Sequence, residues 1–167
     1  MSDYTQIKEQ MKQLKQQQLE AAKGFFNQYS KELFDKYPKL NSFGWVQYTP
    51  WFNDGDECVF SAHTSEDSLR VNGFSLYNDD EEVSEESDTN PNYFSGYQEH
   101  TYEIGEGGRY ERVPNPNHNK ENKALVSEIV TFLQQFKNGD LKRLFGNHVA
   151  VTVNRNGEIG TEEFSHD

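Results

Sequence analysis

The stretch that decides the fold runs from residue 43 to residue 49 and reads Phe43-Gly44-Trp45-Val46-Gln47-Tyr48-Thr49. Aromatic rings alternate in it with small or polar residues, and this period of two is typical of a strand. Residues 58–64 and 69–77 have a similar strand-like pattern. The first two stretches are joined by residues 50–57, which contain the turn-forming sequence Asn53-Asp54-Gly55-Asp56. The centre of the chain therefore predicts a meander of antiparallel strands.

On the N-terminal side, residues 3–37 predict one long helix, because they hold no proline and are rich in good helix formers. At 1.5 Å per residue this helix would be roughly 50 Å long, which is more than a small domain needs. Its apolar residues are spaced alternately by three and four with one glutamine among them, as in a short coiled coil. The candidate oligomerisation residues are Ile7, Met11, Leu14, Gln18, Ala21 and Phe25.

Two interpretations of this helix stay open. In the first, the whole helix lies along its own sheet. In the second, residues 1–24 form a projecting segment that pairs with another copy in a homodimer or higher oligomer, and residues 25–167 form a single domain. The apolar set shifts to Phe26, Tyr29 and Leu33 after the candidate seam, so the second half of the helix is expected to pack on the domain.

On the C-terminal side, residues 93–104 and 109–113 are expected to pair across the glycine-rich tip at residues 105–108. Residues 120–137 carry apolar side chains at helical spacing and predict a second helix. A polar linker with two prolines separates this helix from the strands before it.

The chain is expected to end in a short helix and a hairpin. Asp140 predicts the N-cap of the short helix, which would end at Phe145. The dipeptide Asn156-Gly157 predicts a type I′ turn between two last strands. The predicted fold is thus α+β, with a long N-terminal helix, an antiparallel meander interrupted by an acidic loop, a C-terminal helix pair and a closing β-hairpin.

Length and composition limit the class of protein. The chain has 167 residues and 19.4 kDa, which fits one domain, and its aromatic fraction of 14% is too high for a fully disordered chain. No apolar run approaches the roughly 18 residues of a membrane span. The single cysteine, Cys58, excludes an internal disulfide framework. We therefore expect a cytoplasmic protein with no membrane partner.

The formal charge of −12 is unevenly distributed. Residues 51–111 hold sixteen acidic residues against Arg70 and Arg109 alone, whereas the first fifty residues have a small positive excess. Residues 78–92 are expected to form an extended, mobile loop, because so dense a charge repels itself. Its acidic residues are Asp79, Asp80, Glu81, Glu82, Glu85, Glu86 and Asp88.

This charge bears on the choice of partner. Direct binding of nucleic acid is disfavoured, because a protein that contacts phosphates needs lysines and arginines. A host protein with a basic surface, including one that normally binds nucleic acid, is favoured instead. The alternative interpretation is that the acidic cluster only keeps a loop solvated.

Aromatic rings and carboxylates also gather around the first turn of the meander. We expect them to belong to the partner-binding surface, and the residues concerned are Trp45, Tyr48, Trp51, Asp54, Asp56 and Glu57. A second interpretation is a pocket that binds or processes a small molecule or nucleotide, with His63 or His100 as acid–base group. A third is that the rings are core and the polar residues form a tight turn. The carboxylates do not match a calcium loop, and we expect neither a metal nor a cofactor.

Two segments resemble a known class of sequence. One is residues 43–56 with Cys58 and Phe60, and the other is residues 145–153 continuing to residues 163–167. Together they resemble small acidic proteins of unassigned function that tailed phages encode. The resemblance covers about a third of the chain and transfers no catalytic residue. It implies an accessory phage protein that acts on host proteins, including those of host defence. Together with the acidic middle segment, the many aromatic residues and the lack of a coherent catalytic set, this favours a non-enzymatic protein that binds and inhibits a host protein.

Overall fold

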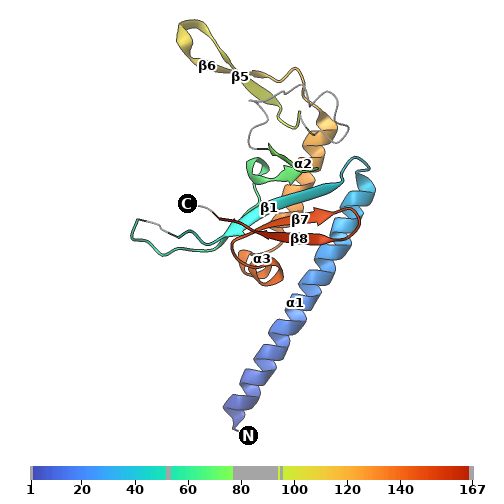
Figure 1. The fold of residues 1–167 in the computed structure, drawn as a ribbon, viewed down its shortest axis with the longest axis vertical. Helices are drawn as coiled ribbons and strands as arrows, with labels where there is room; N and C mark the ends of the chain where they lie inside the picture. Colours follow the sequence, from blue (N-terminus) through green and yellow to red (C-terminus); the bar gives the residue numbers. More distant parts are fainter. Residues whose placement is uncertain (1, 52–53, 77–93, 95, 166–167) are drawn as a thin grey trace.

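The computed structural model describes residues 2–51, 54–76, 94 and 96–165. It has the predicted α+β fold, with one long helix, an antiparallel sheet, two later helices and two C-terminal strands. Figure 1 shows the sheet in the middle of the molecule, with the N-terminal helix and a two-stranded hairpin extending toward opposite ends of the longest axis. The candidate loop at residues 78–92 lies outside the described residues.

The long helix α1 spans Asp3–Lys36 and has two different halves. Ser2 caps its N-terminus, since the Ser2 hydroxyl accepts a hydrogen bond from the backbone of Thr5. Every residue from 2 to 18 is exposed, and Phe26 is the first buried residue of the helix. The N-terminal half therefore extends past the sheet as a single projecting helix (Figure 1).

The main sheet has the strand order β4-β3-β1-β7-β8, in which β4 is Phe74–Ser75 and β3 is Arg70–Val71. A further strand, β2, also pairs with β1. The first strand of the sheet, β1 (Ser42–Tyr48), is the predicted one and pairs with β2 (Ser61–His63) on one side and β7 (Val149–Asn154) on the other. The last strand, β8 (Ile159–Glu163), follows β7 as a hairpin. All pairs are antiparallel, as the meander pattern predicts.

The prediction of one strand over residues 69–77 is wrong. The structure has a short 3₁₀ helix, η1 (Glu66–Ser68), followed by two short strands, β3 (Arg70–Val71) and β4 (Phe74–Ser75). A two-residue turn connects the two strands. Asn72 and Gly73 both have positive φ, at 54° and 86°. Two such residues in succession make a type I′ turn, which reverses the chain tightly.

Two expectations about the C-terminal part are also wrong in detail. The turn between β7 and β8 is not type I′, because Gly157 has a positive φ of 90° while Asn156 does not. Gly157 donates instead to the Asn154 carbonyl and closes a three-residue loop. The short helix α3 spans Asn138–Phe145, so Lys137 is its N-cap and Asp140 lies inside its first turn.

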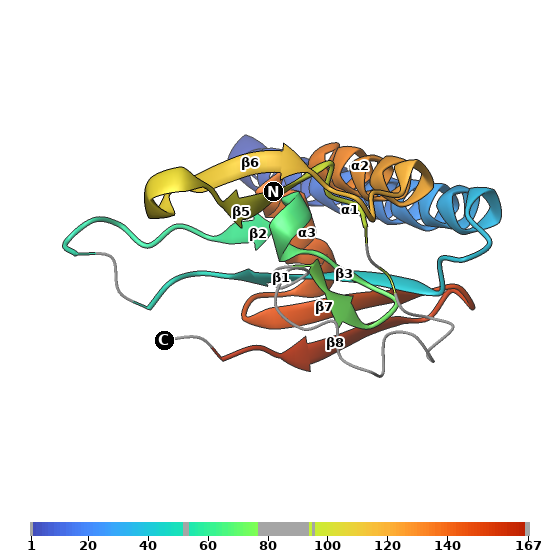
Figure 2. The same cartoon turned by 90° about the horizontal axis from the view of Figure 1, so that it is seen from above.

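Helices cover one face of the sheet and form the core with it. Figure 2 shows α1 and α2 (Lys120–Gln134) side by side on the same side of β1, β7 and β8. Alternate residues of β1 point toward them, and Phe43 and Trp45 are each 1% exposed. The Phe26 ring lies 5.0 Å from that of Phe132 and 6.1 Å from that of Trp45, which ties both helices to the strand.

A second, smaller sheet stands apart from the first. It consists of β5 (His100–Ile104) and β6 (Tyr110–Pro114), which pair with each other across η3 (Glu106–Gly108). The predicted pairing across residues 105–108 is thus confirmed. The described part of the segment before β5 includes the buried rings of Phe94 and Tyr97, which anchor the base of this hairpin.

Candidate functional site

The aromatic side chains of the predicted turn site do not share one surface. Trp45 is 1% exposed, its ring lies 5.4 Å from that of Phe145, and its indole N–H donates to Gln47. The prediction that Trp45 contacts a partner is therefore wrong. The reason is the alternation of β1, which turns Trp45 toward the helices and Tyr48 toward the opposite face.

Tyr48 and Trp51 lie at the end of β1, where each ring stacks on a histidine. The Tyr48 ring is 4.5 Å from that of His63, and the Trp51 ring is 4.5 Å from that of His148 with only 5° between their planes. Trp51 is 71% exposed, whereas Tyr48 is half-buried. Trp51 is thus the ring of the predicted turn site that another molecule would reach most easily.

The three carboxylates of the predicted turn site are exposed on the loop between β1 and β2. Asp54 and Gly55 have φ values of 41° and 92°, which confirms the predicted tight turn. Asp56 and Glu57 follow it and are exposed as well. In Figure 1 this loop extends sideways from the end of β1, so its charges lie beyond the edge of the sheet.

A groove lies on the sheet face opposite the helices, with a volume of about 520 Å³. The stacked rings of Tyr48 and His63 line it together with Arg70 and Glu162. The second candidate histidine, His100, belongs to the separate hairpin, where its Nδ1 lies 3.0 Å from Arg112. His63 and His100, the two alternative acid–base groups of the enzyme interpretation, thus belong to different sheets.

The β5–β6 hairpin has two chemically distinct faces, both exposed. Tyr102, Ile104 and Tyr110 share one face and are between 64% and 74% exposed. On the other face Glu103 stands directly opposite Glu111. Like charges in a cross-strand pair destabilise a hairpin, and a two-stranded sheet is marginally stable by itself. These are features of a contact surface rather than of a folding unit.

Sequence reasoning predicted this hairpin but missed it as a candidate site. Its signal is the alternation of Tyr102 and Ile104 with Thr101 and Glu103. Alternation normally marks a strand with one buried face. The sequence does not show whether any element covers that face, and here the described residues leave all three large side chains exposed.

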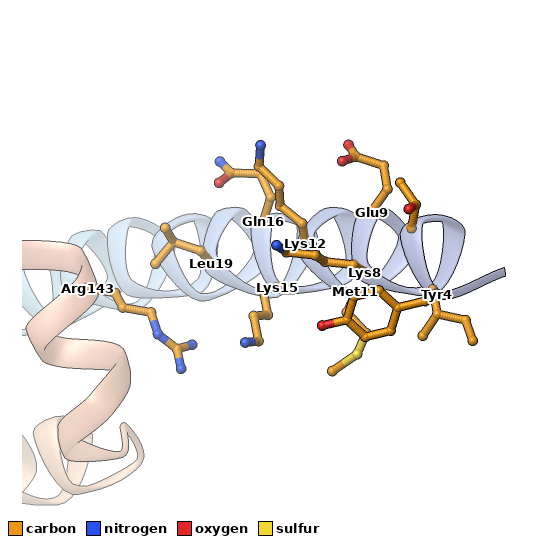
Figure 3. Close-up of a pocket in the computed structure, with 11 residues that line it drawn as sticks. Tyr4, Lys8, Glu9, Met11, Lys12, Lys15, Gln16, Leu19 and Arg143 are labelled. Carbon is orange, nitrogen blue, oxygen red and sulfur yellow. The ribbon is translucent and has the colours of Figure 1, made fainter. Parts of the chain in front are cut away.

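The projecting half of α1 offers a third surface, drawn in Figure 3. Its groove has a volume of about 770 Å³, but ten of the eleven lining residues belong to the one helix and only Arg143 comes from α3. One helix cannot enclose a ligand, so this groove is a helix face. Figure 3 shows Lys15, Met11 and Arg143 pointing to the same side, and this face combines apolar and basic residues.

One predicted feature, the acidic loop, cannot be placed on these surfaces. The acidic residues from Asp79 to Asp88 lie outside the described residues.

Within the described part of the chain no group of three or more potential ligand side chains is arranged to hold a metal. No helix among the described residues is long and apolar enough to cross a membrane.

Comparison of the chain with protein-family models, curated proteins and solved structures found no match.

Proposed function

We propose that this chain is a non-enzymatic binding protein whose β5–β6 hairpin docks on a basic surface of another protein. The observation that carries the proposal is the exposure of Tyr102, Ile104 and Tyr110 on a hairpin that stands apart from the core. Large apolar and aromatic side chains that become desolvated at the centre of an interface supply most of its binding energy. Three of them on so small an element make it the best anchor that the described surface offers.

The chemistry of the partner follows from the opposite face of the hairpin. Glu103 and Glu111 are paired across the strands on the face opposite the three apolar side chains, whereas Arg112 pairs with Tyr102 on the apolar face. A partner that encloses the hairpin would contact both faces, and a lysine or arginine placed between the two glutamates would relieve their repulsion. Charges at the rim of an interface also speed association and set specificity. The sixteen acidic residues in residues 51–111 favour the same kind of partner. Trp51, Asp54, Asp56 and Glu57 would add a second contact.

The resemblance to tailed-phage accessory proteins extends the proposal to a biological setting. In that setting the partner is a host protein with a basic surface, such as a defence or nucleic-acid-handling protein, and docking of the hairpin inhibits it. Covering a basic surface with carboxylates would block the phosphates that normally bind there. The buried position of Trp45 disfavours the alternative of an enzyme built on the turn site.

The test is affinity purification of the tagged chain from its host cells at roughly physiological ionic strength, followed by reconstitution with the purified partner. We expect a protein with a basic surface whose affinity falls at least tenfold for the double variant Tyr102→Ser, Tyr110→Ser. The control is Gln134→Ser, which shortens an exposed side chain of α2 outside the hairpin and outside the α1 stripe. Binding should also weaken with added salt, in part through Glu103 and Glu111.

Three outcomes would contradict the proposal. One is that no specific partner is recovered, and another is that the partner presents an acidic surface. The third is that the hairpin variant binds as tightly as the Gln134→Ser control. Because Tyr102 and Tyr110 are exposed, neither substitution is expected to unfold the domain, and circular dichroism of each variant checks this.

A further inference from the structure

We infer that the projecting half of α1 pairs with the same segment of a second copy, as a parallel, in-register two-stranded coiled coil. The side chains of Tyr4, Ile7, Met11 and Leu14 are between 54% and 75% exposed and follow one another at spacings of three and four. Such a stripe predicts a seam between two helices. Covering such a stripe with a second helix removes its apolar side chains from water and stabilises the projecting segment.

The charges beside the stripe identify the neighbour and its direction. With Tyr4 and Met11 at position a, Lys8 and Lys15 occupy position e and Asp3 occupies position g. In a parallel pair, position g of one helix faces the following position e of the other. Asp3 of each copy then lies opposite Lys8 of the second copy, which is an attractive contact made twice.

An antiparallel pair would bring like charges together. In that arrangement positions e face each other, so Lys8 of one helix would lie near Lys15 of the second. Like charges at this range repel. Gln18, the polar seam residue, also favours the parallel arrangement, because there it meets Gln18 of the second copy and the two amides can donate to and accept from each other.

The domains leave room for this arrangement. At 3.6 residues per turn, the stripe lies roughly 100° around the helix from the face that buries Phe26 and Leu33. A two-fold axis along the seam therefore sets the two domains on opposite sides of the coiled coil. The seam ends near Gln18, because the Phe25 ring already contacts Phe136 of its own domain at 5.8 Å.

The first experiment measures mass by sedimentation. The full chain should give twice the 19.4 kDa of one copy, and Leu14→Asp should give the monomer mass with the domain still folded. The control is Gln13→Asp, which places the same charge on the adjacent residue, away from the stripe, and should remain a dimer. A monomeric wild-type chain, or a Leu14→Asp variant that stays dimeric, would overturn the inference.

The second experiment tests direction, with Cys58 replaced by serine. Ile7→Cys and Leu14→Cys are oxidised separately under mild conditions and run on a non-reducing gel. A parallel pair places each position beside its own copy, so both variants should form covalent dimers, whereas Gln13→Cys should not. The two-fold axis of an antiparallel pair passes only one position of the seam. Cross-linking at one position only, or equally at residue 13, therefore excludes the parallel arrangement.

Discussion

Gln47 is the polar residue through which the sheet holds α3. Its side chain is fully buried, accepts from the Trp45 indole at 3.0 Å and donates to the carbonyls of Leu141 and Gly146 at 3.0 Å and 2.7 Å. A buried amide is tolerated only when its polar atoms are paired. Here one side chain satisfies an indole on its own strand and two carbonyls at the end of a distant helix.

Replacement of Gln47 by leucine should destabilise the domain by about 3 kcal/mol, because it leaves the Trp45 N–H and two carbonyls buried without these bonds. Urea unfolding followed by the fluorescence of the buried Trp45 measures the change. The exposed Gln134→Leu is the control and should change the free energy of unfolding by less than about 0.5 kcal/mol. Equal effects of the two substitutions would show that the hydrogen bonds of Gln47 contribute little.

Tyr37, just after α1, makes the stability of the domain fall at high pH. Burial, with a smaller contribution from the hydrogen bond and negative charge of Glu128, raises the pKa of Tyr37 to about 12 from its ordinary value of 10.0. The folded state thus favours the neutral phenol. The stability that this preference contributes is fully present below pH 10 and is lost as the pH rises through 12.

We therefore expect the free energy of unfolding of the wild-type chain to fall by about 2 kcal/mol relative to Tyr37→Phe between pH 10 and pH 12. Denaturant titrations of both proteins at several pH values measure the difference. Effects of the other titrating groups cancel, since both proteins carry them. A difference that stays constant with pH would mean that Tyr37 has an ordinary pKa in the folded chain.

At the scale of elements, the turn between β3 and β4 forms hydrogen bonds to the loop that connects α1 to β1. The Asn72 amide oxygen accepts from the backbone N–H groups of Asn41 and Ser42, at 2.7 Å and 3.3 Å, and its amide nitrogen donates to the Lys39 carbonyl at 2.9 Å. One side chain in a tight turn thus orders the loop that leads from the long helix into the central strand.

Replacement of Asn72 by alanine should cost about 2 to 3 kcal/mol, from lost hydrogen bonds and from the left-handed backbone that alanine adopts poorly. Asn72→Gly loses the same hydrogen bonds but tolerates the positive φ, so it should cost about 1 kcal/mol less. Urea unfolding of both variants separates the two contributions. A glycine variant as unstable as the alanine variant would assign the whole effect to the side chain.

The helices were predictable from the sequence, and the short strands were not. Residues 120–137 predicted α2 to within three residues, because Asn119 caps it and its apolar residues follow one helical face. Residues 58–64 form a strand only at Ser61–His63, where they pair with β1. Strand length depends on the neighbouring strand as well as on the segment itself, and the neighbour is not visible locally.

In the candidate surfaces, too, some features could be predicted from the sequence and others depend on packing between distant elements. Alternation in β1 predicted a strand, but Trp45 and Trp51 are equally aromatic and only the packing of α1 and α3 decides that the first is buried. The signal of the β3–β4 turn, Asn72-Gly73, was present in the sequence and is a strong one. The alternating apolar residues on both sides of it led instead to the prediction of a single strand.

At the scale of the molecule, one core supports two projections of different chemistry. The exposed half of α1 carries Lys8, Lys12 and Lys15 beside its apolar stripe, whereas the β5–β6 hairpin at the other end carries Glu103 and Glu111 (Figure 1). A pair of copies joined through α1 would therefore present two hairpins at a distance from the seam. Two linked contacts with one partner bind more tightly than either alone.

The projections are expected to be dispensable for folding. In a chain that begins at Leu19, the described residues that are lost (2–18) are all exposed, and Phe26 is the first buried residue of α1. At protein concentrations below those of self-association, its free energy of unfolding should stay within about 1 kcal/mol of the full chain. Phe26→Ala is the contrasting change, since its ring contacts Phe132 and Trp45 in the core, and it should cost about 3 to 5 kcal/mol. Urea titration of the three proteins measures both effects, and a shortened chain that unfolds without cooperativity would show that the domain begins before Leu19.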